Sequence, residues 1–134
     1  MEFIDIASVR GALADGESIE TRDGGGCTPV MRASFLGSVD LVHLLIAEGA
    51  DVNAVDDAGW SSLHYVAQER NAAIAEILLA AGATVEARDD NGNTPLFRAA
   101  FNRATAVIDL LLAAGASLDA SNNHGVSIRE VLSV

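Results

Sequence analysis

The sequence predicts an all-α solenoid, in which helix-turn-helix units are joined by β-turn or hairpin loops. The first observation is self-similarity: matching segments begin at Gly26, Gly59 and Gly92, and a fourth copy begins at Gly125, each 33 residues after the one before. The second is a Gly-Ala pair that recurs at the same spacing, at 49–50, 82–83 and 115–116. The third is that apolar residues recur at helical spacing within each unit. No single unit could bury its apolar face alone, so we expect the units to stack.

Composition limits the classes of protein that remain. A chain of 134 residues with 50% hydrophobic residues fits one folded domain. The net charge is −11 and all eight basic residues are Arg, which argues against a nucleic-acid partner or an anionic membrane. No apolar run reaches the ~18 residues of a membrane span, and no signal-peptide pattern is present. Cys27 is the single cysteine, so an internal disulfide is excluded, and we expect a cytoplasmic protein.

Each unit is expected to open with a tight turn followed by a short first helix. Asp and Gly make the turn, because Gly accepts positive φ. Thr28, Ser61 and Thr94 then stand where a hydroxyl can cap a helix, and Pro29 and Pro95 fall in its first turn. The first helix is rich in Ala, so neighbouring backbones can approach closely.

A second helix is expected in the latter half of each unit. Its apolar residues recur at helical spacing, as in Leu41, Leu44 and Leu45 or in Val107, Leu110 and Leu111. A glycine in the left-handed conformation is expected to end each of these helices. These glycines are Gly49, Gly82 and Gly115.

These segments resemble ankyrin repeats. Residues 94–100, Thr-Pro-Leu-Phe-Arg-Ala-Ala, are similar to the family's Thr-Pro-Leu-His-x-Ala-Ala, and residues 49–53 are similar to its Gly-Ala-Asp-Val-Asn. Leu63 and His64 keep the family's Leu-His pair. In the family this His typically helps to tie neighbouring repeats together by hydrogen bonds, so the resemblance implies that role for His64. The resemblance implies a single ankyrin-repeat domain over residues 1–134. Its parts are an N-terminal capping half-repeat at 3–22 with an amphipathic helix at 3–15, full repeats at 23–55, 56–88 and 89–121, and a partial repeat at 122–134.

The chain departs from the family pattern between its helices. Arg70 and Arg103 stand where the family usually has Gly, and Arg in a left-handed turn costs about 1 kcal/mol. Either the turn geometry is weakened at these two positions or a different turn forms. Met31 and Phe97 replace the family's His, and Ser62 replaces its Pro.

The last unit has no second helix in the sequence. Ile128, Val131 and Leu132 are therefore expected to lack the polar cap that ends a solenoid. The tail could dock unusually, fray or contact another molecule, and the chain could be a fragment of a longer protein.

No set of residues predicts catalysis, a metal or a cofactor. Gly24–Gly26 lack the Lys that a phosphate-binding loop needs, so they predict a turn. The three histidines have no partners at zinc-ligand spacing; they are His43, His64 and His124. The acidic pairs 56–57 and 89–90 offer too few oxygens for calcium, and their first Asp is expected to bond local backbone amides. The sequence therefore predicts no enzyme activity.

Ankyrin repeats bind partners through their turn tips and the exposed face of their first helices. Carried onto matching positions, this implies a partner-binding set of Trp60, Tyr65, Arg32, Arg98, Phe35, Phe101, Asp57, Glu69, Asp90, Asn91 and Asn102. Most of the Arg residues, the single Trp and the single Tyr fall on this front, and these residue types are enriched at binding hot spots. The second helices and the loops after them carry acidic residues and no Arg.

We therefore expect the front to bind a protein segment of acidic and apolar character, centred on Trp60 and Tyr65. The alternative is a surface whose residues satisfy one another. Tyr65 would then stack between Arg32 and Arg98. Arg22 and Arg88 would pair with Asp23 and Asp89, and Phe35 and Phe101 would pack against the inter-helix turns.

Three functions remain open. The leading one is an adaptor, scaffold or regulator that binds a protein partner without catalysis. The alternative is a bacterial immunity or inhibitor protein that neutralises a basic toxin or effector through its acidic surface, in which case affinity should fall strongly with salt. The third is self-association through the C-terminal end.

Overall fold

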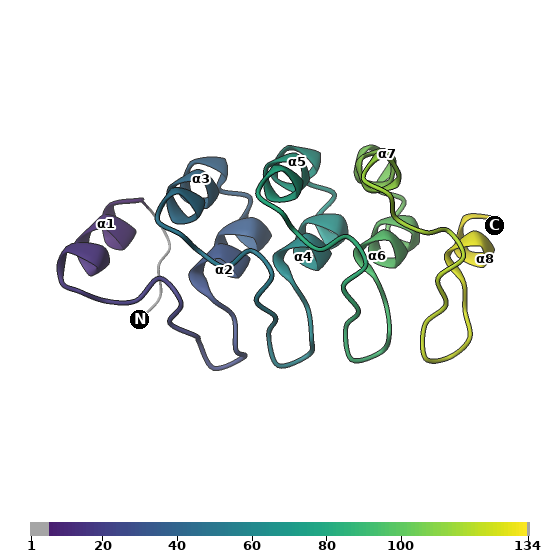
Figure 1. Cartoon of the computed structure of the whole chain (residues 1–134), viewed down its shortest axis with the longest axis horizontal. Helices are drawn as coiled ribbons and strands as arrows, with labels where there is room; N and C mark the ends of the chain where they lie inside the picture. The colour runs from purple at the N-terminus through teal and green to yellow at the C-terminus, as the bar shows by residue number, and fades with distance from the viewer. Residues whose placement is uncertain (1–5, 134) are drawn as a thin grey trace.

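The computed structural model describes residues 6–133, which form two rows of antiparallel helices and a series of long turns (Figure 1). The first row is α2 (Pro29–Leu36), α4 (Ser62–Gln68), α6 (Pro95–Phe101) and α8 (Ile128–Leu132). The second row is α3 (Val39–Ala47), α5 (Ala72–Ala80) and α7 (Thr105–Ala113), and α1 (Ile6–Ala14) covers one end. Residues 3–5 of the expected N-terminal helix and residue 134 lie outside the described part. An all-α solenoid is thus confirmed, since this part has no strand and only two isolated bridges, Val55–Ser61 and Ser121–Ser127.

Two of the three expected hydroxyl caps are present. Ser61 Oγ accepts from the backbone N–H of His64, and Thr94 Oγ1 accepts from that of Phe97. The prediction for Thr28 is wrong: its hydroxyl makes no cap bond and is buried without a hydrogen-bond partner among the described residues. Pro29, whose φ is fixed at a helical value, supports the start of α2 instead.

The turns between paired helices keep left-handed geometry even where Arg replaces Gly. Arg70 has φ 56° and Arg103 has φ 54°, so the alternative of a different turn does not occur. The backbone N–H of Arg70 donates to Ala67 O, and that of Asn71 donates to Val66 O at 2.9 Å. These bonds help to hold a conformation that costs a non-glycine residue about 1–2 kcal/mol. The expected left-handed glycines that end the second helices are confirmed, at φ 93°, 92° and 98° for Gly49, Gly82 and Gly115.

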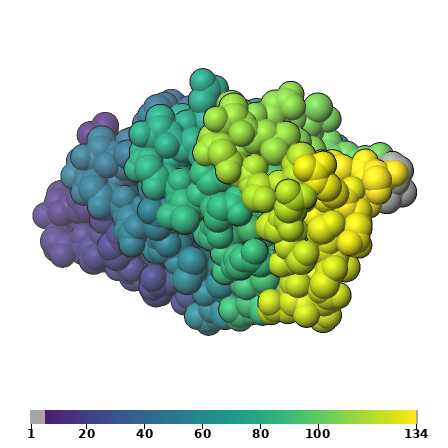
Figure 2. Space-filling model, turned by 45° about the vertical axis from the view of Figure 1, so that its right-hand side comes forward, coloured from purple at the N-terminus to yellow at the C-terminus, as the bar shows by residue number. Residues whose placement is uncertain are grey.

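The core lies between the two rows and runs the length of the stack. Fully buried side chains come from both rows, for example Leu45, Leu78 and Leu111 from the second row and Val30, Leu63 and Leu96 from the first. Each layer therefore covers the apolar face of the next, and the space-filling view shows these successive layers in contact (Figure 2).

Of the three apolar residues expected to lack a polar cap, Ile128 does not need one, because α8 packs against α6 and leaves Ile128 only 1% exposed. Val131 is half-buried, whereas Leu132 is 41% exposed.

Candidate protein-interaction site

Three aromatic side chains and one cation form a continuous line across the first-row helices. Trp60, in the turn before α4, lies with its ring centroid 5.0 Å from that of Tyr65 on α4. Tyr65 meets Phe35 of α2 edge-on, with centroids 5.9 Å apart and planes at 77°. At the other end, the guanidinium carbon of Arg98 on α6 lies 4.9 Å from the Trp60 ring centroid. We call Phe35, Tyr65 and Trp60 the aromatic row.

The turn before α4 fixes the orientation of Tyr65. Its hydroxyl donates to Asp56 Oδ2. The other oxygen of Asp56 accepts from the backbone N–H groups of Ala58 and Trp60, each at 2.9 Å. Asp56 thus couples the turn to the first helix of the same unit. Burial and the bond to Asp56 raise the pKa of Tyr65, so the hydroxyl remains protonated and acts as a donor.

A pocket of about 250 Å³ opens beside this row between α2 and α4. Its lining is Cys27, Met31, Arg32, Phe35 and Tyr65. Burial raises the pKa of the Cys27 thiol, so it presents a neutral sulfur rather than a nucleophilic thiolate. Arg32 pairs with Asp23 and the Tyr65 hydroxyl donates to Asp56, and the rest of the lining is apolar or neutral. The pocket has room for one side chain.

His64 supports the row from behind. It is fully buried, and its Nδ1 accepts from the backbone N–H of Ser61 at 3.1 Å. Its Nε2 therefore carries the proton and donates to the carbonyl oxygen of Asn93 at 2.8 Å. Burial lowers the pKa of His64, which favours this neutral form. The Trp60 ring lies 5.8 Å from the imidazole, so Trp60 rests on a side chain that is itself held in place.

The structure brings five of the predicted site residues together. Trp60, Tyr65, Phe35 and Arg98 are in the line of contacts, and Arg32 lines the pocket. The other six lie apart from that line in the described contacts. Asp57, Asp90 and Asn91 lie in the turns, Glu69 and Asn102 cap the C-terminal ends of α4 and α6, and Phe101 is the last residue of α6.

The turn residues also serve the stack itself. The backbone N–H of Asp57 donates to Gly25 O at 3.1 Å, and that of Asp90 donates to Ala58 O at 3.0 Å. Asn91 O accepts from the backbone N–H of Asn123 at 2.9 Å. Each turn is therefore tied to the next, which gives the tips a fixed spacing.

The self-satisfied arrangement considered above differs from what is observed. Arg98 stacks on Trp60, so Tyr65 does not lie between two arginines. Arg22 Nη1 donates to Val55 O at 2.6 Å and Arg88 Nη1 donates to Ser121 O at 2.7 Å, so these cations bond carbonyl oxygens of the next turn.

Phe35 and Phe101 are 48% and 63% exposed, so a large part of each ring lies on the surface. Phe101 lines a pocket together with Arg103 of the inter-helix turn, as the alternative expects. The partner-binding set predicted from the sequence leaves out Asp56, Cys27 and Met31, although Cys27 stands at a turn tip. The recurrence of Asp at positions 23, 56 and 89 was the available signal for the first of these.

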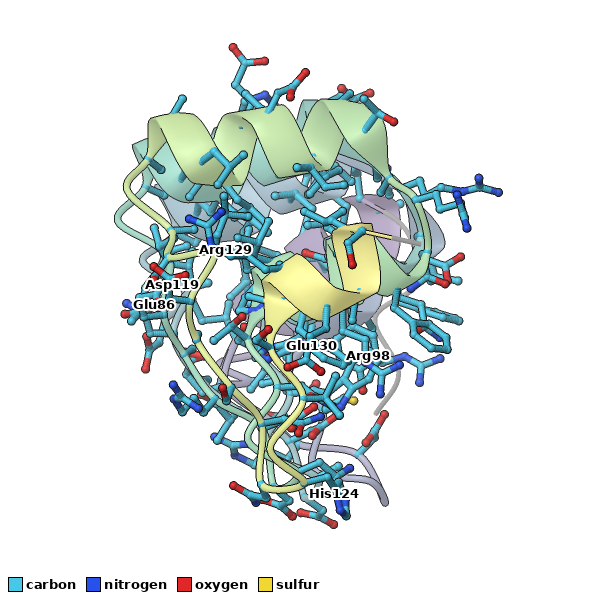
Figure 3. All side chains as sticks on the ribbon, turned by 90° about the vertical axis from the view of Figure 1, so that its right-hand side faces the viewer. Glu86, Arg98, Asp119, His124, Arg129 and Glu130 are labelled. Atoms are coloured by element: carbon cyan, nitrogen blue, oxygen red, sulfur yellow. The ribbon has the colours of Figure 1, made fainter. Side chains whose placement is uncertain are left out.

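The opposite side of the molecule has a different character. Asp40, Glu76 and Asp109 on the second-row helices are exposed. A groove of about 500 Å³ runs between α3 and α5, where His43 and Glu76 border apolar residues. In the end-on view, Glu86, Asp119 and Arg129 lie on one side of α8 and Arg98 lies on the other (Figure 3).

Residues 6–133 contain neither a membrane-spanning helix nor a metal-binding cluster. None of their helices combines the length and the apolar character that crossing a bilayer requires. No group of three or more His, Cys, Asp or Glu side chains in this range is arranged to hold a metal ion.

Comparison with known proteins agrees with the architecture. Residues 30–122 match the family model described as Ankyrin repeats (3 copies). A 51-residue segment is 43% identical to the Homo sapiens protein Ankyrin repeat domain-containing protein 49. The aligned segment covers 37% of this chain and 21% of that protein. The chain thus matches only about a fifth of the length of that curated relative. Since the family model covers most of the helix pairs, the chain belongs to the ankyrin repeat family.

Proposed function

We propose that this protein is a non-catalytic interaction module, an adaptor or regulator that binds a protein partner through the face formed by the first-row helices and their turns. Members of the ankyrin repeat family are generally protein-protein interaction modules. The observation that carries the proposal here is the uninterrupted contact line from Arg98 through Trp60 and Tyr65 to Phe35.

The composition of this line supports a hot spot. Trp, Tyr and Arg are the residues most enriched where truncation costs binding energy. Trp60 and Tyr65 are half-buried, so they are pre-ordered and lose little conformational freedom when a partner covers them. Phe35, Leu36 and Phe101 are each about half or more exposed and extend the apolar surface along the same helices.

The test compares variants of the two faces. The full chain, the double variant Trp60→Ala/Tyr65→Ala and a back-face variant, Asp40→Asn/Glu76→Gln, are used to capture partners from lysate of the source organism. The affinity of each captured protein is then measured with purified components. We expect the front variant to weaken binding by about 2 kcal/mol or more, or roughly 30-fold, and the back variant to have little effect.

Because Trp60 packs on buried His64, its truncation could also disturb the fold. Phe35→Ala, at a position that is 48% exposed, is therefore tested in parallel, and the melting temperature of each variant is measured by circular dichroism. A partner that both front variants bind as tightly as the parent would overturn the proposal. If the back variant alone loses affinity, and the parent's affinity falls steeply with salt, the immunity or inhibitor function becomes the better one.

A further inference from the structure

The first-row helices carry three equivalent positions, 32, 65 and 98, and each has an Asp in its own turn, at 23, 56 and 89. In the first two units the helix residue binds that Asp. Arg32 Nη1 donates to Asp23 Oδ2 at 3.0 Å, and the Tyr65 hydroxyl donates to Asp56 Oδ2. In both units, the polar group of the helix residue is therefore already bonded to a carboxylate of the protein.

The third unit keeps the same pair of residue types but does not pair them. Arg98 forms no ion pair with any carboxylate among the described residues, and its Nε is buried without an acceptor. Asp89 is only 6% exposed, and its Oδ2 has no donor in the same set. The difference has a local cause: the preceding turn places Trp60 beneath Arg98, and the guanidinium stacks 4.9 Å from that ring.

This stacking prepares Arg98 to bind a carboxylate. The ring fixes the plane of the guanidinium through a cation–π contact. Nε is buried, whereas the two Nη groups at the edge of the guanidinium are neither buried without a partner nor bonded to an acceptor among the described residues, so they remain available to a bound acid. A carboxylate matches that edge with two parallel hydrogen bonds. The chain has a net charge of −11 and only eight arginines. Arg98 is half-buried and is not neutralised by any of the described carboxylates, so its charge can bind an acid of a partner.

The surrounding charges favour one carboxylate over a phosphate group. Asp56, Asp89 and Arg98 all lie close enough to His64 to act on its charge, so the other charged groups in this neighbourhood are acidic. A phosphate carries up to two negative charges and is normally held by a cluster of cations. A single aspartate or glutamate side chain carries one negative charge, so it is repelled less by these acids than a phosphate and matches the one available cation.

The second anchor is the pocket of about 250 Å³ at the far end of the aromatic row, lined by Cys27, Met31 and Phe35 among others. Arg98 and this pocket are separated by the rings of Trp60 and Tyr65, which are in contact with one another. The steps along this path are 4.9 Å from Arg98 to Trp60, 5.0 Å to Tyr65 and 5.9 Å to Phe35, and both Tyr65 and Phe35 line the pocket. A peptide in extended conformation, rising about 3.3 Å per residue, would therefore reach the pocket in about three to five residues.

We propose that the interaction face binds an extended protein segment through two anchors. The carboxylate of an Asp or Glu pairs with Arg98, and an apolar side chain about three to five residues away enters the pocket between α2 and α4. This proposal rests on the function proposed above and adds the chemistry and spacing of the segment that is recognised.

The probe is a library of random twelve-residue peptides displayed on phage and selected on the full chain. We expect enriched peptides to carry an Asp or Glu and an apolar residue at this spacing. One enriched peptide is then synthesised with a fluorescent label, together with a form in which Gln or Asn replaces its acidic residue. Dissociation constants for both are measured by polarisation on the parent and on Arg98→Gln.

The two substitutions should be coupled. Removing the peptide carboxylate is expected to weaken binding to the parent about tenfold, as for a charge-assisted bond, and to have little effect on Arg98→Gln. Arg70→Gln is the matched control, because it removes the same charge from an exposed inter-helix turn and should leave affinity within about twofold. Equal melting temperatures would show that Arg98→Gln folds normally.

Three results would overturn the inference. If the peptides bind Arg98→Gln as tightly as the parent but lose affinity on Trp60→Ala/Tyr65→Ala, the proposed function stands and the carboxylate anchor is wrong. If neither variant affects binding, the proposed function fails as well. If no peptide is enriched on the parent, the face does not recognise a linear segment.

Discussion

His64 joins two neighbouring helix pairs: its Nε2 donates across 2.8 Å to the carbonyl oxygen of Asn93, 29 residues further along the chain. The Nδ1 of the same ring accepts a hydrogen bond from the backbone N–H of Ser61, the residue before α4. One buried side chain therefore caps the start of its own helix and binds the next turn. Because the Trp60 ring lies against this imidazole, the geometry of the interaction face depends on it.

We expect His64→Phe to lower the free energy of unfolding by about 1–3 kcal/mol. Phe occupies the equivalent position at Phe97, so the shape is tolerated. The N–H of Ser61 would lose its acceptor, and the oxygen of Asn93 would keep only the backbone N–H of Asp89. Urea denaturation followed by circular dichroism measures the change. His43→Gln, at an exposed site on α3, is the control and should change stability by less than about 0.5 kcal/mol. Equal stability of the parent and His64→Phe would contradict the linking role.

Stability should also fall below neutral pH because of the same residue. Burial lowers the pKa of His64 from its usual 6.5 in the folded state. Above pH 6.5 the imidazole of His64 is mostly neutral in both the folded and the unfolded chain. As the pH falls below 6.5, the unfolded chain takes up a proton that the folded chain refuses, so the unfolding free energy decreases until the folded pKa is reached.

The lowered pKa of Asp23 acts in a separate window. The backbone N–H of Cys27 and the charge of Arg32 favour its carboxylate, so its stabilisation is present above its usual 3.8 and is lost as the pH falls below that value. Unfolding curves between about pH 5 and pH 7.5 therefore isolate His64. His64→Phe should flatten the dependence in this range, and His43→Gln should retain it. A parent whose stability is constant from pH 5 to pH 7.5 would contradict the prediction.

The sequence predicts the fold because each unit repeats the same local rules. The spacing of Thr94, Pro95 and the apolar residues after them is enough to place helix starts and helix faces. Left-handed turns are predicted at glycines but remained open at Arg70 and Arg103, because only the bonds around the turn show that the chain keeps the strained geometry.

The candidate site is harder to predict from the sequence, because it depends on which of several possible partners each side chain contacts. Arg32 and Arg98 occupy equivalent positions in the sequence, and each follows the Asp of its own turn by nine residues. Arg32 binds the Asp of its own turn, whereas Arg98 meets a Trp supplied by the preceding unit. Contacts between neighbouring units decide which partner each arginine has, and the 33-residue periodicity alone does not predict these contacts.

Two glycines with left-handed φ should differ in their tolerance of alanine. Gly82 (φ 92°) ends α5, and an added Cβ would meet nothing within 4 Å, so Gly82→Ala should cost only the backbone strain, about 1–2 kcal/mol. Gly92 (φ 76°) lies in a turn, where a Cβ would sit 2.9 Å from the backbone N of Asn123. That N–H donates to Asn91 O, so a shift would weaken the bond between turns.

We therefore expect Gly92→Ala to cost about 1–3 kcal/mol more than Gly82→Ala. Urea midpoints of both variants, measured against the parent, give the comparison. Equal losses would mean that the turn adjusts without affecting its neighbour. A Gly82→Ala variant as stable as the parent would contradict the left-handed assignment at the end of α5.

The two threonines that precede α2 and α6 should respond in opposite directions to the same substitution. Thr94 Oγ1 accepts the N–H of Phe97 at 3.3 Å, so Thr94→Val loses a helix cap and should destabilise by about 1 kcal/mol. Thr28 Oγ1 is buried and has no partner among the described residues, so valine, which has nearly the same shape, removes an unsatisfied hydroxyl.

Thr28→Val should therefore be neutral or should stabilise by up to about 1 kcal/mol. Both residues are β-branched in both forms and precede a proline, so backbone preferences cancel between the two variants. Thermal and urea unfolding of the pair measure the difference directly. If Thr28→Val is destabilised as much as Thr94→Val, its hydroxyl makes a cap in solution, and the two helix starts are equivalent after all.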